Sequence, residues 1–184
     1  GVDPHTYKLT RSDVAKLAAA DIVFYSGLLL EGKITDALTR VAGSGKPVHS
    51  VAEQLDPKLL LTPPGFDGNP DPHVWMDPSR VAAALSSLAD ALAEADPDHA
   101  NGYRSRAESY AAELRGLDAE IEQQLGSIPP QNRKLVTSHD AMGYFADRYG
   151  LEVLATPFPA SGPEAEASAQ TIKEVEDAVS SSGV

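Results

Sequence analysis

The sequence of 184 residues contains no cysteine. A disulfide framework, a thiolate metal site and a cysteine nucleophile are therefore excluded, and a transition-metal site would have to use histidine and carboxylate. There is no run of about 18 apolar residues and no basic stretch followed by an apolar one at the start, so we expect neither a transmembrane helix nor a signal peptide. Glycine-rich phosphate loops and serine nucleophile elbows are also absent.

Basic residues are few, because 15 Lys and Arg stand against 27 Asp and Glu, which gives a formal net charge of −12. This charge opposes binding to nucleic acid and to anionic membranes, and it weakly attracts cations. Hydrophobic residues make up 42% of the chain, which is enough to bury a core. The composition therefore indicates a globular chain of one or two small domains.

Apolar spacing, capping residues and turn residues predict an alternation of helices and strands in two blocks, separated by a long helical segment. A loop rich in proline, glycine and asparagine at 56–71 carries a histidine motif toward the surface. This alternation favours parallel α/β sheets. The expected helices span 11–20, 34–41, 78–95, about 97–125, 141–149 and from about 168, and the expected strands span 21–25, 46–49, 134–137 and 151–155.

The helical segment that follows Asp96-Pro97 is unusually long for a small lobe, because at about 1.5 Å per residue it would span roughly 40 Å. Its place between two α/β blocks indicates a rigid connector. The predicted fold class is therefore α/β, with two lobes of parallel-type sheet and flanking helices joined by one long connector helix. We expect the first lobe at 1–95, the connector at 96–127 and the second lobe at 128–184.

Three of the five histidines share a context. His5 and His73 each follow Asp-Pro, and His139 stands in Thr-Ser-His-Asp at the end of a predicted strand. Ligands of open α/β sheets bind beyond the carboxyl ends of the strands, and the prolines limit the backbone before each imidazole. Three neutral imidazoles suit zinc and tolerate other first-row divalent ions. Taken singly, a histidine is more often a surface or capping residue than a ligand, but the repeated tripeptide favours a metal site.

Several neighbours of these motifs have a predicted role. Asp3, Asp71 and Asp140 are placed to accept a hydrogen bond from an imidazole N–H or from loop backbone, and so to orient the ligands. We interpret His99, in the first turn of a helix, as solvent-exposed, and His49, at a strand end, as structural. Three aromatic side chains could wall a site, but we expect them to pack in the core: Tyr7, Trp75 and Phe158.

Three stretches, at 1–34, 71–81 and 137–151, resemble a known family in order and spacing along nearly the whole chain. They read GVDPHTYKLTRSDVAKLAAADIVFYSGLLLEGKI, DPHVWMDPSRV and TSHDAMGYFADRYGL. The family is that of the metal-receptor solute-binding proteins of zinc and manganese ABC transporters.

The resemblance implies a function and a ligand set. It implies an extracytoplasmic protein, periplasmic or a cell-surface lipoprotein, that captures a divalent metal between two lobes and delivers it to an ABC-transporter permease. It implies that His5 and His73 bind the ion from the first lobe and His139 from the second. We expect a monomer without enzymatic activity. The family's first strand and helix, and the end of its second lobe with a carboxylate ligand, are expected to lie outside this sequence.

The metal is expected to be zinc, with manganese as the alternative. Family members have either histidine or glutamate at the position of His139, and the histidine form resembles the zinc-type or mixed receptors. Imidazole is softer than carboxylate and favours zinc, whereas manganese prefers oxygen. Zinc-specialised relatives often have a histidine-rich loop before the second motif, but 59–70 contains no histidine, which keeps manganese open.

Two other functions fit parts of the sequence. A zinc-dependent hydrolase would also use three histidines and an open coordination position, with Asp140 or Glu164 as the base, but no catalytic metal motif is present. An adhesin or surface-interaction module fits the acidic composition and leaves the paired motifs unexplained.

Overall fold

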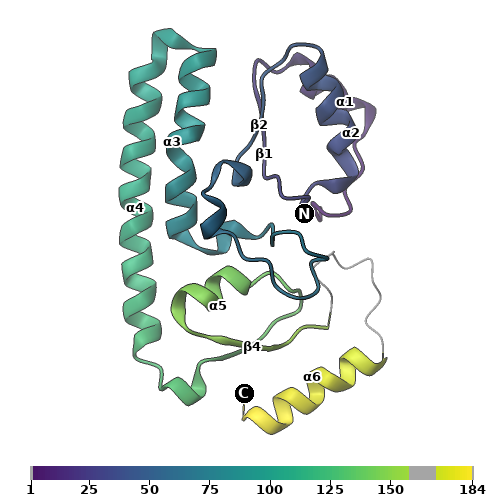
Figure 1. Cartoon of the computed structure of the whole chain (residues 1–184), viewed down its shortest axis with the longest axis vertical. Coiled ribbons are helices and arrows are strands. Elements are labelled where there is room, and N and C mark those ends of the chain that lie inside the picture. The colour runs from purple at the N-terminus through teal and green to yellow at the C-terminus, as the bar shows by residue number, and fades with distance from the viewer. Residues whose placement is uncertain (1, 158–168, 184) are drawn as a thin grey trace.

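The computed structural model describes residues 2–157 and 169–183, and it has two small α/β units beside a long helical pair (Figure 1). In the first unit β1 (Val23–Tyr25) pairs in parallel with β2 (Val48–Ser50). In the second, β3 (Lys134–Val136) pairs in parallel with β4 (Glu152–Ala155). The predicted fold class of two parallel α/β lobes is confirmed.

The first lobe packs its helices on the β1–β2 pair. Helix α1 (Arg11–Ala19) begins with a capping box between Thr10 and Asp13, as the sequence predicts. Helix α2 (Thr35–Gly43) buries Leu38 and Val41 against Val23 of β1, and these three residues form a small core. In a parallel pair the connection must cross from one end of the sheet to the other, and α2 makes this crossing.

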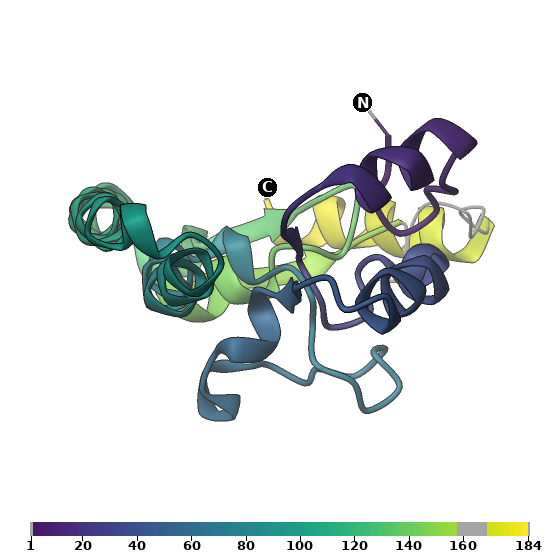
Figure 2. The same cartoon turned by 90° about the horizontal axis from the view of Figure 1, so that it is seen from above.

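Helices α3 (Pro78–Ala95) and α4 (Ala100–Gly126) lie side by side along one side of the molecule (Figure 1). Figure 2 shows the two helices nearly end-on, at one side of the rest of the chain. Asp77 caps α3 by accepting a hydrogen bond from Ser79 N–H at 2.7 Å. Helix α4 begins later than predicted, because residues 97–99 form a separate 3₁₀ turn.

Helix α4 passes from the level of the first lobe to that of the second, which confirms the long connecting helix (Figure 1). His99 lies before its start and contacts Asp96 at 2.8 Å, and 73% of its side chain is exposed, which confirms the predicted exposure. The boundaries proposed at 95/96 and 127/128 stay a prediction. Along the described ranges, no helix combines the length and apolar character needed to cross a bilayer.

The second lobe contains α5 (Gly143–Tyr149) and α6 (Ala169–Ser182) around the β3–β4 pair. The predicted start of α5 at residue 141 is wrong, because the preceding residues form the loop that carries His139, where Ala141 N–H bonds to the His139 carbonyl at 2.9 Å. Gly150 ends the helix with φ of 68°, a left-handed conformation that glycine adopts without strain.

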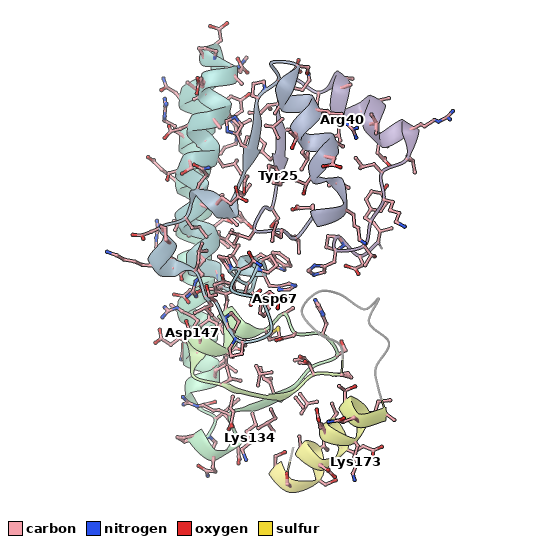
Figure 3. The ribbon with its side chains drawn as sticks, turned by 45° about the vertical axis from the view of Figure 1, so that its right-hand side comes forward. Tyr25, Arg40, Asp67, Lys134, Asp147 and Lys173 are labelled. Carbon is pink, nitrogen blue, oxygen red and sulfur yellow. The ribbon has the colours of Figure 1, made fainter. Side chains whose placement is uncertain are left out.

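A second apolar cluster joins the two lobes. Tyr144 of α5 is fully buried among first-lobe residues that include Ala52, Leu55 and Val74. Beside this cluster, Arg80 of α3 pairs with Asp147 of α5 at 3.2 Å. Figure 3 shows Asp147 on the side of the second lobe that faces the long helical pair. The position of α5 is therefore linked to the first lobe by burial of apolar surface and by an ion pair.

Helix α4 is also bonded to α5. Arg148 donates two hydrogen bonds to the Asp118 carboxylate, at 2.9 and 2.6 Å, and Tyr149 donates a third at 2.9 Å. The hydrogen bonds from Arg148 lower the pKa of Asp118 below its usual value. Because the folded protein favours the charged carboxylate, Asp118 stabilises the fold above the pKa of the unfolded chain, and this contribution is lost as the pH falls through the lowered pKa.

We predict that Asp118→Asn lowers the free energy of unfolding by about 2 kcal/mol at neutral pH. The asparagine amide is uncharged and has one acceptor oxygen, so it cannot replace the carboxylate that accepts two hydrogen bonds from Arg148. The difference from the unsubstituted protein should persist down to a pH of about 4 and then shrink. Urea unfolding over a pH series measures it. The control is Asp90→Asn. Asp90 pairs with Arg104, and the two side chains are 65% and 52% exposed, so this substitution should change the free energy of unfolding by less than about 1 kcal/mol. Equal losses in the two variants would contradict the prediction.

Candidate metal centre

Three histidines distant in sequence meet where the two lobes face each other. His73 Nε2 lies 3.2 Å from His5 Nε2 and 3.2 Å from His139 Nε2. One ring nitrogen from each residue falls within 4.8 Å of the other two. His5 and His73 come from the first lobe and His139 from the loop after β3, so both lobes contribute to the group.

The spacing of these nitrogens fits ligands around one ion. Two nitrogens that each lie about 2.0–2.1 Å from a tetrahedral zinc ion are about 3.3 Å apart. The two Nε2 separations of 3.2 Å agree with that value. The donor set is therefore compatible with a first-row divalent metal without a large movement of the rings.

His73 has the best-defined orientation. It is 2% exposed, and its Nδ1 lies 2.6 Å from Asp71 Oδ1, which also accepts the His73 backbone N–H at 2.9 Å. A carboxylate beside Nδ1 requires the proton on that nitrogen, which leaves the lone pair of Nε2 directed at the other two histidines. Asp71 thus has the geometry expected of a residue that orients a metal ligand.

Asp3 stands in the corresponding place before His5 but acts on the backbone. Its Oδ1 accepts the His5 backbone N–H at 3.0 Å, and its Oδ2 accepts the Thr6 hydroxyl at 3.3 Å. Burial lowers the pKa of His5, and the nearby His73 ring lowers it further. The neutral imidazole, which is the form that binds metals, is therefore favoured at this position.

His139 lies in a turn fixed by its own carbonyl group. This carbonyl accepts hydrogen bonds from the Thr137 hydroxyl and from the Ala141 N–H, both at 2.9 Å. The next residue, Asp140, is half-buried, and burial raises its pKa, as does the Asp71 carboxylate. Its role as a hydrogen-bond partner of a ligand stays a prediction.

The three histidines line an open cleft of about 400 Å³ between the lobes. Trp75 lies at this cleft with 42% exposure, and its ring centroid is 5.2 Å from that of His73, so the expectation that Trp75 packs in the core is wrong. Tyr7 is partly exposed, and it donates a hydrogen bond to Asp13 in the first turn of α1 at 2.6 Å. His49 stacks on Phe24, with centroids 5.6 Å apart. Two residues considered from the sequence lie outside the described ranges: Phe158 and Glu164.

Residues of α5 approach the centre, which the sequence patterns did not indicate. The Tyr144 hydroxyl donates to the Asp71 carbonyl at 2.7 Å. Gly143 lies so close to the same residue that a Cβ atom there would be 2.9 Å from Asp71 Oδ2. The absence of a side chain at Gly143 therefore lets the first turn of α5 lie against the buried carboxylate.

Two α/β lobes along one long helix, with a histidine-lined cleft between them, are the architecture of the two-lobed solute-binding proteins. The model of a family described as ZnuA, zinc-uptake complex component A, periplasmic, matches residues 1–184, and the chain belongs to this family.

Individual relatives agree with this assignment. The manganese-binding lipoprotein MntA of Bacillus subtilis is 41% identical over 153 residues, which are 83% of this chain and 49% of that protein. The iron-binding protein YfeA of Yersinia pestis is 33% identical over 155 residues, 83% of this chain and 48% of that protein. The solved structure of the periplasmic zinc-binding protein TroA from Treponema pallidum matches with a TM-score of 0.93 at 33% identity, over 100% of this chain and 65% of that one. The chain spans about half the length of the curated relatives it matches.

We predict that Gly143→Ala lowers the free energy of unfolding by about 1–3 kcal/mol, because the added methyl group would displace the buried Asp71 carboxylate. The matched control is Gly116→Ala in α4, where a Cβ would meet nothing within 4 Å and where alanine should raise the free energy of unfolding by about 1 kcal/mol. Chemical denaturation of the metal-free protein measures both. A stabilised Gly143→Ala variant would contradict the close approach.

Proposed function

We propose that the chain is part of an extracytoplasmic solute-binding protein, periplasmic or a membrane-anchored lipoprotein, that captures a divalent transition metal and delivers it to an ABC-transporter permease. The observation that carries the proposal is the convergence of three imidazole nitrogens from two lobes within 4.8 Å of one another. Membership in a zinc-uptake family supports it. The metal is the cargo of this protein, and we expect the receptor to act as a monomer.

In this proposal His5, His73 and His139 bind the ion, and the lobes at 1–95 and 128–184 supply them across the cleft. Asp71 keeps the proton of His73 on Nδ1, so that Nε2 can coordinate. Asp3 shapes the loop that presents His5. Asp140, beside His139, adds negative charge near the cation. The acidic composition, with a net charge of −12, favours the approach of cations from solution.

Zinc is the proposed metal and manganese the alternative. Three imidazoles form a nitrogen-rich donor set, which suits zinc better than manganese. Relatives are named for manganese, iron and zinc, so membership in the family does not by itself fix the ion.

We propose binding without catalysis. The family is described as a component of an uptake complex, which supports a receptor rather than a hydrolase.

We predict that the protein in its full natural length, stripped of metal, binds one zinc ion tightly in a calorimetric titration, and manganese more weakly. His73→Ala should weaken zinc binding by at least 100-fold, because it removes the central nitrogen of the group and leaves Asp71 without its ring partner. The matched control is His99→Ala, which removes an exposed histidine far from the group and should leave the affinity unchanged.

The same titration separates the alternatives. No saturable binding of either ion would refute the receptor function. Tighter binding of manganese than zinc would retain the receptor and reverse the metal preference. Metal-dependent turnover of ester or phosphate substrates, abolished by Asp140→Asn, would favour a hydrolase instead.

A further inference from the structure

We propose that Tyr144 is a positioning residue for His73, through which helix α5 of the second lobe fixes the orientation of a metal ligand in the first lobe. This inference rests on the proposed function, because the ligand role of His73 belongs to it. The Tyr144 hydroxyl bonds to the Asp71 carbonyl and not to the His73 ring. It acts through the backbone of Asp71.

The Tyr144 side chain crosses from one lobe into the other. It belongs to α5 and is 0% exposed, and it packs with Ala52, Leu55 and Val74 of the first lobe. Few large side chains of the described residues are buried so completely, and two of the others are Asp71 and His73. The tyrosine hydroxyl lies 2.7 Å from the Asp71 carbonyl, so the ring is buried beside the pair it is proposed to position.

The hydroxyl group of Tyr144 joins the two ends of the first-lobe loop at 62–70. It donates a hydrogen bond to the Asp71 carbonyl at 2.7 Å and accepts one from the Leu61 N–H at 3.2 Å. The Asp71 N–H in turn donates directly to the Leu61 carbonyl at 2.8 Å. Leu61 and Asp71 are therefore paired by one direct hydrogen bond and by one that passes through the tyrosine hydroxyl.

Asp71 transfers this restraint to the histidine. Its Oδ1 accepts both the backbone N–H and the ring Nδ1 of His73, at 2.9 and 2.6 Å. Only Pro72 separates the two residues, and proline fixes its own φ angle. A change in the backbone position of Asp71 would therefore turn the imidazole, whose Nε2 lies 3.2 Å from the other two histidines.

The ring of Tyr144 is also held in place. Arg80 of α3 lies with its Cζ 4.6 Å from the ring centroid, and its Nε donates to the Leu59 carbonyl at 2.7 Å. Arg80 is further paired with Asp77 and Asp147, so its charge is compensated on both sides. Burial raises the pKa of Tyr144, which keeps its hydroxyl protonated and able to donate.

Removal of the hydroxyl alone should disturb the metal centre. In Tyr144→Phe the ring remains to fill its place beside Arg80, but the Leu61 N–H and the Asp71 carbonyl lose a partner in a buried setting. Unsatisfied buried backbone groups are unfavourable, so the loop should shift to find new partners. Such a shift would move Asp71, and with it His73, away from the arrangement that suits the ion.

The test compares Tyr144→Phe with Tyr149→Phe in the full natural length of the protein. Both substitutions remove one hydroxyl from α5, but the Tyr149 hydroxyl bonds to Asp118 of α4 at 2.9 Å, away from the centre. Zinc affinity is measured by competition with a chromophoric chelator, and ligand geometry by the visible absorption of the cobalt-substituted protein. We expect Tyr144→Phe to weaken zinc binding about 10–100-fold and to alter the cobalt spectrum, and Tyr149→Phe to change neither.

Thermal unfolding of the metal-free variants separates positioning from stability, because both substitutions should lower Tm. A third variant, in which 4-aminophenylalanine replaces Tyr144, keeps a polar group at the end of the ring and should recover affinity even if Tyr144→Phe folds poorly. Unchanged affinity and an unchanged cobalt spectrum in Tyr144→Phe would overturn the inference, as would equal effects at Tyr149. Absence of metal binding in the unsubstituted protein would refute the proposed function and the inference with it.

Discussion

The hydrogen bond between His73 Nδ1 and Asp71 Oδ1 is the interaction on which the centre depends. At 2.6 Å and with both residues almost fully buried, it fixes the tautomer that leaves Nε2 available. A carboxylate as deeply buried as Asp71 is stable only when hydrogen bonds replace its water. Pro72 limits the backbone before His73, and Gly143 and the Tyr144 hydroxyl both lie against Asp71, so three neighbouring features meet at this one contact.

Two kinds of contact, at different positions along the helical pair, connect the second lobe to the rest of the molecule. Near the cleft, Arg80 and Asp147 pair beside the buried apolar cluster. Farther down α4, Asp118 accepts bonds from the last turn of α5. Because each two-stranded sheet is too small to position a lobe by itself, these contacts with α3 and α4 help to hold α5 in place beside the first lobe.

Local signals predicted most of the fold. Asp77-Pro78 and Gly150 have strong capping preferences, so the start of α3 and the end of α5 were placed well. The three histidines were found because their motifs are short and distinctive. Trp75 was misplaced because it lies in a 3₁₀ turn, where helical and strand periodicities do not tell which side faces the core. Tyr144 fits an ordinary apolar position of a helix, and only the folded chain shows that its hydroxyl lies between Leu61 and Asp71.

The long helical pair has a consequence for selectivity. If the three histidines hold the ion as proposed, two of them belong to the first lobe and the third to the second, and α4 runs beside both lobes, so the size of the site is an elastic property of the whole molecule. First-row metals with similar ligand preferences differ in bond length by small fractions of an ångström. A stiff protein would then bind these metal ions with different affinities, because each ion requires a different deformation free energy. Substitutions along α3 and α4, far from the cleft, would change the preferred ion without altering a single ligand.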